Sequence, residues 1–153
     1  MQSLFEKLNL KDIKEIVVLN PPPSFELVLT SLTGVKVHRK TPPEAVVRFA
    51  LVFAKTQREV DDATDALMTK LEADALLWFC YPKQSSKTLR CEFNRDNGWE
   101  VLGRGGYEPV RQVSIDEDWS ALRFRRVEFI KKLTRNPAMA ISQAGKTRAR
   151  APG

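Results

Sequence analysis

Polar side chains follow a strongly apolar run in the middle of the chain, "LLWFCYPKQSSK" at residues 76–87. The candidate ligand-binding residues of this segment are Lys83, Ser85, Ser86 and Lys87. Lysine ammonium groups can bind a phosphate or a carboxylate, and serine hydroxyls can donate hydrogen bonds to the same oxygens. The segment therefore predicts a site for a small anionic ligand. The alternative is a solvated loop whose serines make local turn hydrogen bonds.

Six further residues are candidate ligand-binding residues because they follow or precede predicted strands and helices. They are Asn20, Arg95, Asp96, Asp116, Trp119 and Ser120. Asp96 would complement a helix dipole at the start of its helix, from which Arg95 could reach back toward the site. A tryptophan at a turn is costly unless it covers an apolar edge or contacts a partner. Trp119 is therefore interpreted as a lid over the core or, alternatively, as an interface residue.

Few residues of the sequence are suited to catalysis or to metal binding. Cys80 and Cys91 are the only cysteines and His38 is the only histidine, so a tetrahedral zinc set of cysteine and histidine is excluded. The sequence also lacks a Walker loop and a nucleophile elbow. We therefore expect no metal and no cofactor, and we favour a protein that is not an enzyme. Catalysis by Asp96 and Asp116 is the alternative, if the fold brings the two carboxylates together.

Apolar runs and turn residues predict that strands and helices alternate along the chain. Strands are predicted at residues 15–20, 35–39, 49–54 and 75–81, and helices at 3–9, 25–32 with Ser24 as the cap, 56 to about 71, and 94–102. Three of these strands are almost continuously apolar, as is typical of strands that are buried on both faces. Thr56 precedes Glu59 by three residues, the spacing of a helix capping box.

Residues 108–115 and 119–127 alternate in polarity and predict an antiparallel hairpin at the end of the domain. Within it, Arg123 and Arg125 flank an apolar residue, so their guanidinium groups are predicted to share one face. The whole pattern predicts an α/β fold, a Rossmann-like three-layer sandwich with a mostly parallel sheet and this C-terminal hairpin. Ligands bind at the carboxyl ends of such strands, so Asn20 and the lysine–serine segment are predicted to share one crevice.

Length and charge predict one domain followed by a basic tail. The chain has 153 residues, with 25 Lys or Arg and 19 Asp or Glu. Residues 131–153 contain six of the basic residues and no acid, so residues 1–130 carry 19 of each sign. We expect residues 1–130 to fold and residues 131–153 to be disordered, with weak, salt-sensitive nucleic-acid contact through the tail as one possible role. No secretory signal and no membrane-spanning run is evident, so we expect a cytoplasmic protein without membrane contact.

Several segments resemble a family of small bacterial proteins catalogued as a domain of unknown function. The resemblance rests on "VVLNPP", "LVFAKTQREV", "LLWFCYPKQSSK", "NRD" and "SIDEDWSALRFR" and covers roughly residues 5 to 128. Its distinctive parts are the Tyr-Pro-Lys with following serines, the Arg-Asp pair and the Asp-x-x-Trp-Ser segment. The resemblance implies a small α/β domain and brings no established activity.

The order of elements is also similar to the class I methyltransferase fold. That resemblance implies a glycine-rich turn after the first strand, for approach of S-adenosylmethionine, and an acid after the second strand, for the ribose hydroxyls. The first strand instead ends in Asn20 and three prolines, and the second ends in Val-His-Arg-Lys. Proline lacks the backbone N–H that a cofactor would need. We therefore expect a methyltransferase-like shape without that chemistry.

Three functions from different classes follow from these observations. The leading hypothesis is a non-catalytic domain that binds a small anionic ligand or a protein partner at the strand-end crevice. The first alternative is a divergent, methyltransferase-like transferase that acts on an anionic substrate. The second alternative is a weak nucleic-acid binder that acts through the basic tail.

Overall fold

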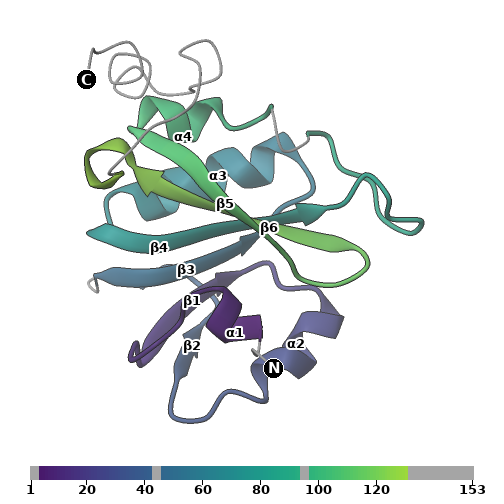
Figure 1. Cartoon of the computed structure of the whole chain (residues 1–153), viewed down its shortest axis with the longest axis horizontal. Helices are drawn as coiled ribbons and strands as arrows, with labels where there is room; N and C mark the ends of the chain where they lie inside the picture. Colours follow the sequence, from purple (N-terminus) through teal and green to yellow (C-terminus); the bar gives the residue numbers. More distant parts are fainter. Residues whose placement is uncertain (1–3, 43–45, 94–96, 131–153) are drawn as a thin grey trace.

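A computed structural model describes residues 4–42, 46–93 and 97–130 of the chain. It has one six-stranded sheet in the order β2-β1-β3-β4-β6-β5 (Figure 1). The strands are β1 (Glu15–Leu19), β2 (Lys36–His38), β3 (Val47–Phe53), β4 (Leu71–Pro82), β5 (Tyr107–Ser114) and β6 (Trp119–Arg126). The helices are α1 (Leu4–Lys7), α2 (Pro23–Leu29), α3 (Gln57–Met68) and α4 (Glu100–Arg104), and a 3-10 turn covers Val127–Phe129.

The first four strands are parallel, and the last two form an antiparallel hairpin. β1 pairs with β2 and β3, and β3 pairs with β4, all in parallel. β6 then pairs antiparallel with both β4 and β5. Because Leu19 lies beside Val52 and Phe53 lies beside Cys80, the carboxyl ends of β1, β3 and β4 reach one edge of the sheet. The predicted mostly parallel sheet with a C-terminal antiparallel hairpin is confirmed.

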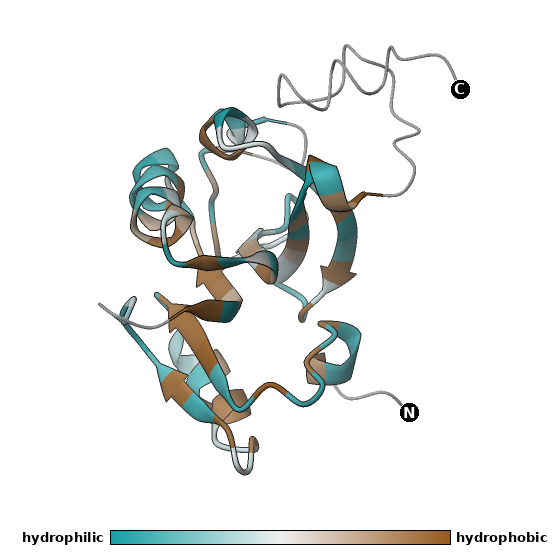
Figure 2. Ribbon diagram, turned by 90° about the vertical axis from the view of Figure 1, so that its left-hand side faces the viewer, coloured by the Kyte–Doolittle hydropathy of each residue, from teal (hydrophilic) through white to brown (hydrophobic). Residues whose placement is uncertain are grey.

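Apolar residues fill both faces of the sheet, which makes three layers. On one face, Phe5 and Leu8 near α1 and Phe25 of α2 pack against the strands. On the other face, Val60 of α3 and Leu102 of α4 do the same. Figure 2 shows the central strands in the brown of apolar residues between these helices. Burial of alternate side chains on opposite faces explains why these strands are apolar at nearly every position.

The capping box predicted at the start of α3 is present. The Thr56 hydroxyl accepts a hydrogen bond from the Glu59 backbone N–H at 3.1 Å, and the Glu59 carboxylate accepts one from the Thr56 N–H at 3.2 Å. These bonds satisfy donors that a helix start otherwise leaves unpaired. α3 buries Val60, Ala63 and Leu67 against the sheet, and its position fixes the end of β3 that precedes it.

Two helix boundaries differ from the prediction. α2 begins at Pro23, one residue before the predicted cap, Ser24, because proline suits the first helical turn, where no backbone N–H is needed. α2 also ends at Leu29, where the hydroxyls of Thr30 and Ser31 donate to the carbonyls of Leu27 and Val28 and so complete the last turn.

Other elements also have different lengths from those predicted. α4 begins at Glu100 rather than near residue 94, and it follows a positive-φ glycine, Gly98 (φ 91°). A glycine in that conformation does not continue a helix. β4 begins at Leu71, four residues earlier than predicted.

The predictions for the tail and for the membrane are only partly covered by the described residues. Residues 131–153, predicted to be disordered, lie outside those residues. Among the helices of the described part, none has both the length and the apolar character that crossing a bilayer requires.

Candidate functional site

A cavity of about 460 Å³ lies at the carboxyl ends of β1 and β3. Residues 20–24 after β1 and residues 53–55 at the end of β3 form two of its sides. Thr88 and Leu89 of the loop after β4, and Asp118 and Trp119 of the β5–β6 hairpin, form the others, and Glu59 of α3 completes it. We call this space the strand-end cavity. Its position is the one where open α/β sheets bind ligands.

Asn20 lines the strand-end cavity and connects the end of β1 to the end of β3. Its backbone is left-handed, with φ of 57°, a conformation that costs other L-residues more than it costs asparagine or glycine. Its side-chain Nδ2 donates to the Phe53 carbonyl at the end of β3, at 3.4 Å. The left-handed turn leads the chain into Pro21–Pro23, which line the cavity and have no N–H to offer a ligand.

The two carboxylates of the strand-end cavity are already hydrogen-bonded within the protein. Glu59 accepts from the backbone N–H groups of Lys55 (2.9 Å) and Thr56 (3.2 Å). Asp118 accepts from the hydroxyls of Ser86 (2.7 Å) and Thr88 (3.3 Å). These hydrogen bonds, accepted by Oε1 of Glu59 and Oδ1 of Asp118, hold the cavity walls in place.

Lys55 is the remaining charged residue of the cavity. It follows β3 and its side chain is exposed. Within residues 4–42, 46–93 and 97–130 its ammonium group makes no ion pair or hydrogen bond. Among the described residues, the lining carries this one positive side chain and the two negative ones of Glu59 and Asp118, so an anionic or acceptor group would bind beside Lys55, where the ammonium group can donate to it.

Aromatic rings form the apolar wall of the cavity. Trp119 is only 5% exposed, and its ring lies edge-on to Phe53 with centroids 5.1 Å apart. Phe53 in turn packs against Phe25 of α2, at 4.7 Å. Trp119 thus covers the core, as predicted, and also faces the cavity. A flat apolar group could pack against this wall with little loss of conformational entropy on the protein side.

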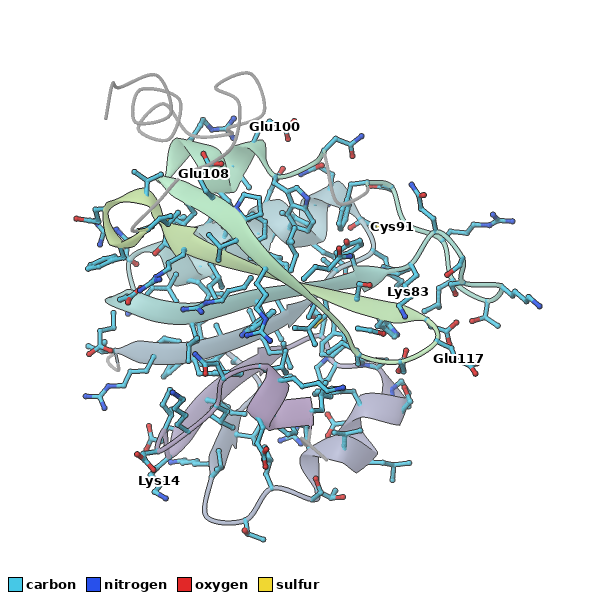
Figure 3. All side chains as sticks on the ribbon, in the orientation of Figure 1. Lys14, Lys83, Cys91, Glu100, Glu108 and Glu117 are labelled. Atoms are coloured by element: carbon cyan, nitrogen blue, oxygen red, sulfur yellow. The ribbon has the colours of Figure 1, made fainter. Side chains whose placement is uncertain are left out.

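The lysine–serine segment lies at the same edge of the sheet but mostly lines a different space. Lys83 and Ser86 border a second cavity of about 280 Å³. The Lys83 ammonium donates to the Ser114 hydroxyl at 2.7 Å, across to the hairpin turn (Figure 3). Ser85 and Lys87 are exposed and line neither of the two cavities. The structure therefore brings Lys83 and Ser86 to the hairpin, and it separates them from Asn20.

The loop after β4 is the wall between these spaces. Ser86 binds Asp118 and also accepts a hydrogen bond from the Leu89 N–H at 3.1 Å. At its far end the Glu92 N–H donates to the Lys55 carbonyl at 3.0 Å. Leu89 lines both the strand-end cavity and the smaller cavity. Ser86 thus makes the local bonds that the alternative interpretation of this segment expects, and it anchors a cavity wall.

The remaining candidate residues have structural positions or lie outside the described part. Asp116 accepts from the N–H groups of Asp118 (2.8 Å) and Trp119 (2.9 Å), which fixes the hairpin turn. Ser120 is buried on β6 opposite Tyr81. Arg95 and Asp96 lie outside the described residues, so the convergence of Asp96 with Asp116 and the reach of Arg95 toward the site stay predictions.

Neither Cys80 nor Cys91 has the environment of a nucleophile. Burial raises the pKa of the Cys80 thiol well above its ordinary value. Burial also raises the pKa of Cys91, which lies half-buried beside the smaller cavity (Figure 3). Both groups therefore stay as thiols near neutral pH, and the thiolate is the reactive form.

Sequence reasoning did not identify Thr88, Leu89 or Asp118 as cavity residues. Thr88 and Leu89 follow the serine segment, where neither charge nor periodicity marks them. Asp118 is typical of a turn residue, and its contact with Ser86 joins positions 32 residues apart. Contacts over that separation depend on the pairing of β4 with β6, which local patterns do not specify.

Comparison with solved structures shows likeness to two structures of LepI, one of a variant "in complex with SAH and substrate analogue" and one in "complex with SAM". For both the TM-score is 0.50 at 12% identity, and the alignment covers 80% of this chain and 39% of LepI. The likeness shows the fold. The N-methyltransferase NodS from Bradyrhizobium japonicum WM9 aligns with a TM-score of 0.43 at 14% identity, over 74% of each chain.

No protein-family model and no curated protein matches the chain. The resemblance to the bacterial family of unknown function therefore stays a prediction. The chain spans well under half of the LepI chain that it resembles, so the activity of LepI is a property of that protein. What the comparison shows for this chain is an arrangement of the α/β elements like that of the aligned part of LepI.

The residues at the ends of β1 and β2 do not fit S-adenosylmethionine in the manner expected from the fold. Pro21–Pro23 supply no N–H groups at the turn after β1. After β2, Arg39 forms a bidentate ion pair with Glu26 of α2, at 2.6 and 3.0 Å, where an acid would be needed for ribose hydroxyls. This hydrogen-bonded pair lowers the pKa of Glu26. No residue of β2 lines the strand-end cavity.

Proposed function

We propose that this protein is a ligand-binding domain that holds a small molecule in the strand-end cavity. The ligand has a flat apolar part, which packs on Trp119 and the prolines, and an anionic or acceptor group, which binds Lys55. The observation that carries this proposal is the pairing of an unengaged ammonium group with an aromatic wall in one cavity of about 460 Å³. A few convergent polar groups in a mostly apolar hollow are typical of small-molecule sites.

We favour binding over catalysis because the acid–base groups of the cavity are two carboxylates that also hold its walls in place. Glu59 and Asp118 each accept two or more hydrogen bonds from the protein. None of the cavity-lining residues of the described part is a histidine or a cysteine. A general base needs a free lone pair within reach of its substrate, and within the described residues only Oε2 of Glu59 and Oδ2 of Asp118 accept no hydrogen bond from the protein.

A thermal-shift panel with a charge-matched pair of variants tests the proposal. The panel contains aromatic carboxylates, aryl phosphates, nucleotides, S-adenosylmethionine and its product S-adenosylhomocysteine. A true ligand raises the unfolding midpoint in a concentration-dependent way. Lys55→Gln should weaken binding of an anionic ligand about tenfold, since a charge-assisted hydrogen bond contributes roughly 1.5–3 kcal/mol. Lys36→Gln, which removes an exposed charge from β2, should leave the affinity unchanged, and equal losses in both variants would contradict the proposal.

Methyl transfer is the second candidate function, and the structural comparisons favour it over a purely binding role. The LepI structures that share the fold are described with S-adenosylmethionine and with S-adenosylhomocysteine. If this candidate is correct, these two compounds should stabilise the protein and other nucleosides should not. Under the binding proposal they leave the midpoint unchanged, because the ends of β1 and β2 lack the groups that would hold them.

A further inference from the structure

The hairpin strands leave part of one sheet face without a helix over it. In Figure 1, α3 and α4 lie behind the sheet, α1 and α2 lie over β1 and its neighbours, and no helix of the described residues lies in front of β5 and β6. The side chains of Val113, Trp119 and Ala121 belong to the core on this front side. Alternation along the strands therefore places Arg111, Arg123 and Arg125 on the same face. We call this surface the open face.

The pairing of the strands brings the arginines of the open face together. Arg123 lies directly opposite Arg111 on β5 and opposite Trp78 on β4. Directly opposed residues of antiparallel strands have side chains on one face, close enough to interact, and like charges there are destabilising. The repulsion between Arg111 and Arg123 is lost if an anion lies between their guanidinium groups.

Only one acid neutralises these charges within the described residues. Arg125 donates two hydrogen bonds to the carboxylate of Asp74, at 2.9 and 2.8 Å. Arg111 and Arg123 form no ion pair with any residue in 4–42, 46–93 or 97–130. Burial and the neighbouring cations Arg125 and Arg111 lower the pKa of Arg123, which is consistent with an excess of positive charge on the open face.

The Nε atom of Arg123 is the most specific indication of a ligand. It is buried and has no hydrogen-bond partner among the described residues. A buried donor without an acceptor costs about 1–3 kcal/mol, and native proteins rarely leave one unsatisfied. The guanidinium fork of arginine matches the oxygens of phosphate or carboxylate in a bidentate manner.

We propose that Arg111 and Arg123, held in place beside the Asp74–Arg125 pair, form a binding site for a phosphate-sized oxyanion on the open face. The occupant is inorganic phosphate or the phosphate group of a small ester. None of these residues lines the strand-end cavity, so this site is independent of the ligand proposed there. On binding, the Arg123 side chain turns so that Nε, which is shielded from solvent in the structure, donates to one oxygen of the anion, and Arg111 approaches the anion from the neighbouring strand.

Side-chain NMR of the full chain tests this site with inorganic phosphate as the probe. We expect phosphate, at constant ionic strength, to shift the Arg123 Nε–H resonance in a saturable manner. That resonance is assigned by its loss in Arg123→Met. Arg111→Gln should weaken phosphate binding about tenfold, whereas Arg104→Gln, at the exposed end of α4, should not change it. An Arg123 resonance that does not respond to phosphate, or equal weakening in the Arg111 and Arg104 variants, overturns the proposal.

Two further measurements strengthen the test: one identifies the source of the anion, and the other asks whether Arg123 has a structural role instead. Phenyl phosphate that binds at least as tightly as inorganic phosphate supports an ester occupant, whereas tighter binding of inorganic phosphate supports the free ion. Acetate that binds as tightly as either would contradict a phosphate-sized site.

In phosphate-free buffer Arg123→Met should unfold at the same temperature as the wild type or higher, because an unsatisfied buried donor is removed. Its midpoint should no longer rise with phosphate. A large loss of stability without phosphate would instead indicate a structural arginine and overturn the proposal.

Discussion

Asn20 has a backbone conformation that determines where the prolines of the cavity lie. We predict that Asn20→Ala unfolds with a free energy about 1 kcal/mol lower than Asn20→Gly, because alanine in a left-handed conformation is strained and glycine is not. Urea titration of the two variants measures the difference. Both variants lose the Nδ2 bond to Phe53, so that bond cancels from the comparison. Equal stabilities would contradict the view that the left-handed turn constrains this residue.

Asp74 should make stability depend on pH in the acidic range. Its hydrogen bonds with Arg125 lower the pKa of Asp74 below its ordinary value of about 3.9. A carboxyl group whose pKa is lowered on folding stabilises the protein above the unfolded pKa, and this contribution is lost as the pH falls through the folded pKa. Asp74→Asn should therefore be less stable than the wild type at pH 6, and the difference should shrink as the pH falls below the ordinary pKa of an aspartate. Asp65→Asn, at an exposed position of α3, is the matched control for the loss of a carboxylate, and an equal dependence on pH in both variants would contradict the role of the Asp74–Arg125 pair.

The pattern of single residues predicted the face of the sheet on which a side chain lies better than it predicted the hydrogen-bond partner of that side chain. The alternation of Arg123 and Arg125 correctly placed both guanidinium groups on one face, and the cost of exposing an indole correctly indicated that Trp119 covers the core. The partner of Lys83 was not predicted, because Ser114 lies 31 residues away and only the pairing of β6 with both β4 and β5 brings the two together.

At the scale of elements, the capping box of α3 fixes one side of the strand-end cavity. Thr56→Ala removes the hydroxyl that accepts from the Glu59 N–H, and we predict a loss of about 1 kcal/mol in unfolding free energy. Thr56→Ser keeps an acceptor and should lose much less. Urea unfolding measures both. If the alanine and serine variants are equally stable, the cap does not contribute to the stability of this helix.

The loop after β4 should depend on Asp118 for its order. Asp118→Ala removes the acceptor of the Ser86 and Thr88 hydroxyls, so the Ser86–Leu89 turn loses its anchor. We predict that the Leu89 amide, which donates to Ser86, exchanges with solvent about tenfold faster, since local opening costs less free energy. Glu117→Ala in the same hairpin turn is the matched control. Unchanged exchange at Leu89 in the Asp118 variant would show that the loop is held by other contacts.

The elements with the clearest signals were predicted from sequence, and those that depend on tertiary contacts were not. The strands of the parallel sheet and α3 have apolar periodicity and a cap, so their type and order were predicted correctly, although β4 begins four residues before its predicted start. The start of α2 was misplaced because proline and serine both suit the first turn of a helix. α4 was predicted too early because its start depends on packing, since Trp99 at its N-cap position makes no side-chain capping bond.

At the scale of the whole molecule, the parallel arrangement produces the cavity. β1, β3 and β4 end at one edge, and the β5–β6 hairpin folds back beside β4 so that its turn covers part of that edge (Figure 1). The fold class and the location of a crevice could be derived from sequence for this reason. The division of this crevice into separate cavities by the loop after β4 could not be derived from sequence, because it rests on hydrogen bonds between distant segments. Nucleic-acid contact through residues 131–153 stays a prediction.

The most direct test of the account is ¹⁹F NMR of the full chain labelled with 5-fluorotryptophan. Of the three tryptophans, Trp119 lines the strand-end cavity, whereas Trp78 and Trp99 are buried in the cores on opposite faces of the sheet. A compound that raises the unfolding midpoint should shift the Trp119 resonance, identified by its loss in Trp119→Phe, and leave the other two nearly unchanged. A stabilising compound that leaves the Trp119 resonance unshifted, with an affinity that Lys55→Gln does not alter, would contradict the assignment of the ligand site to this cavity.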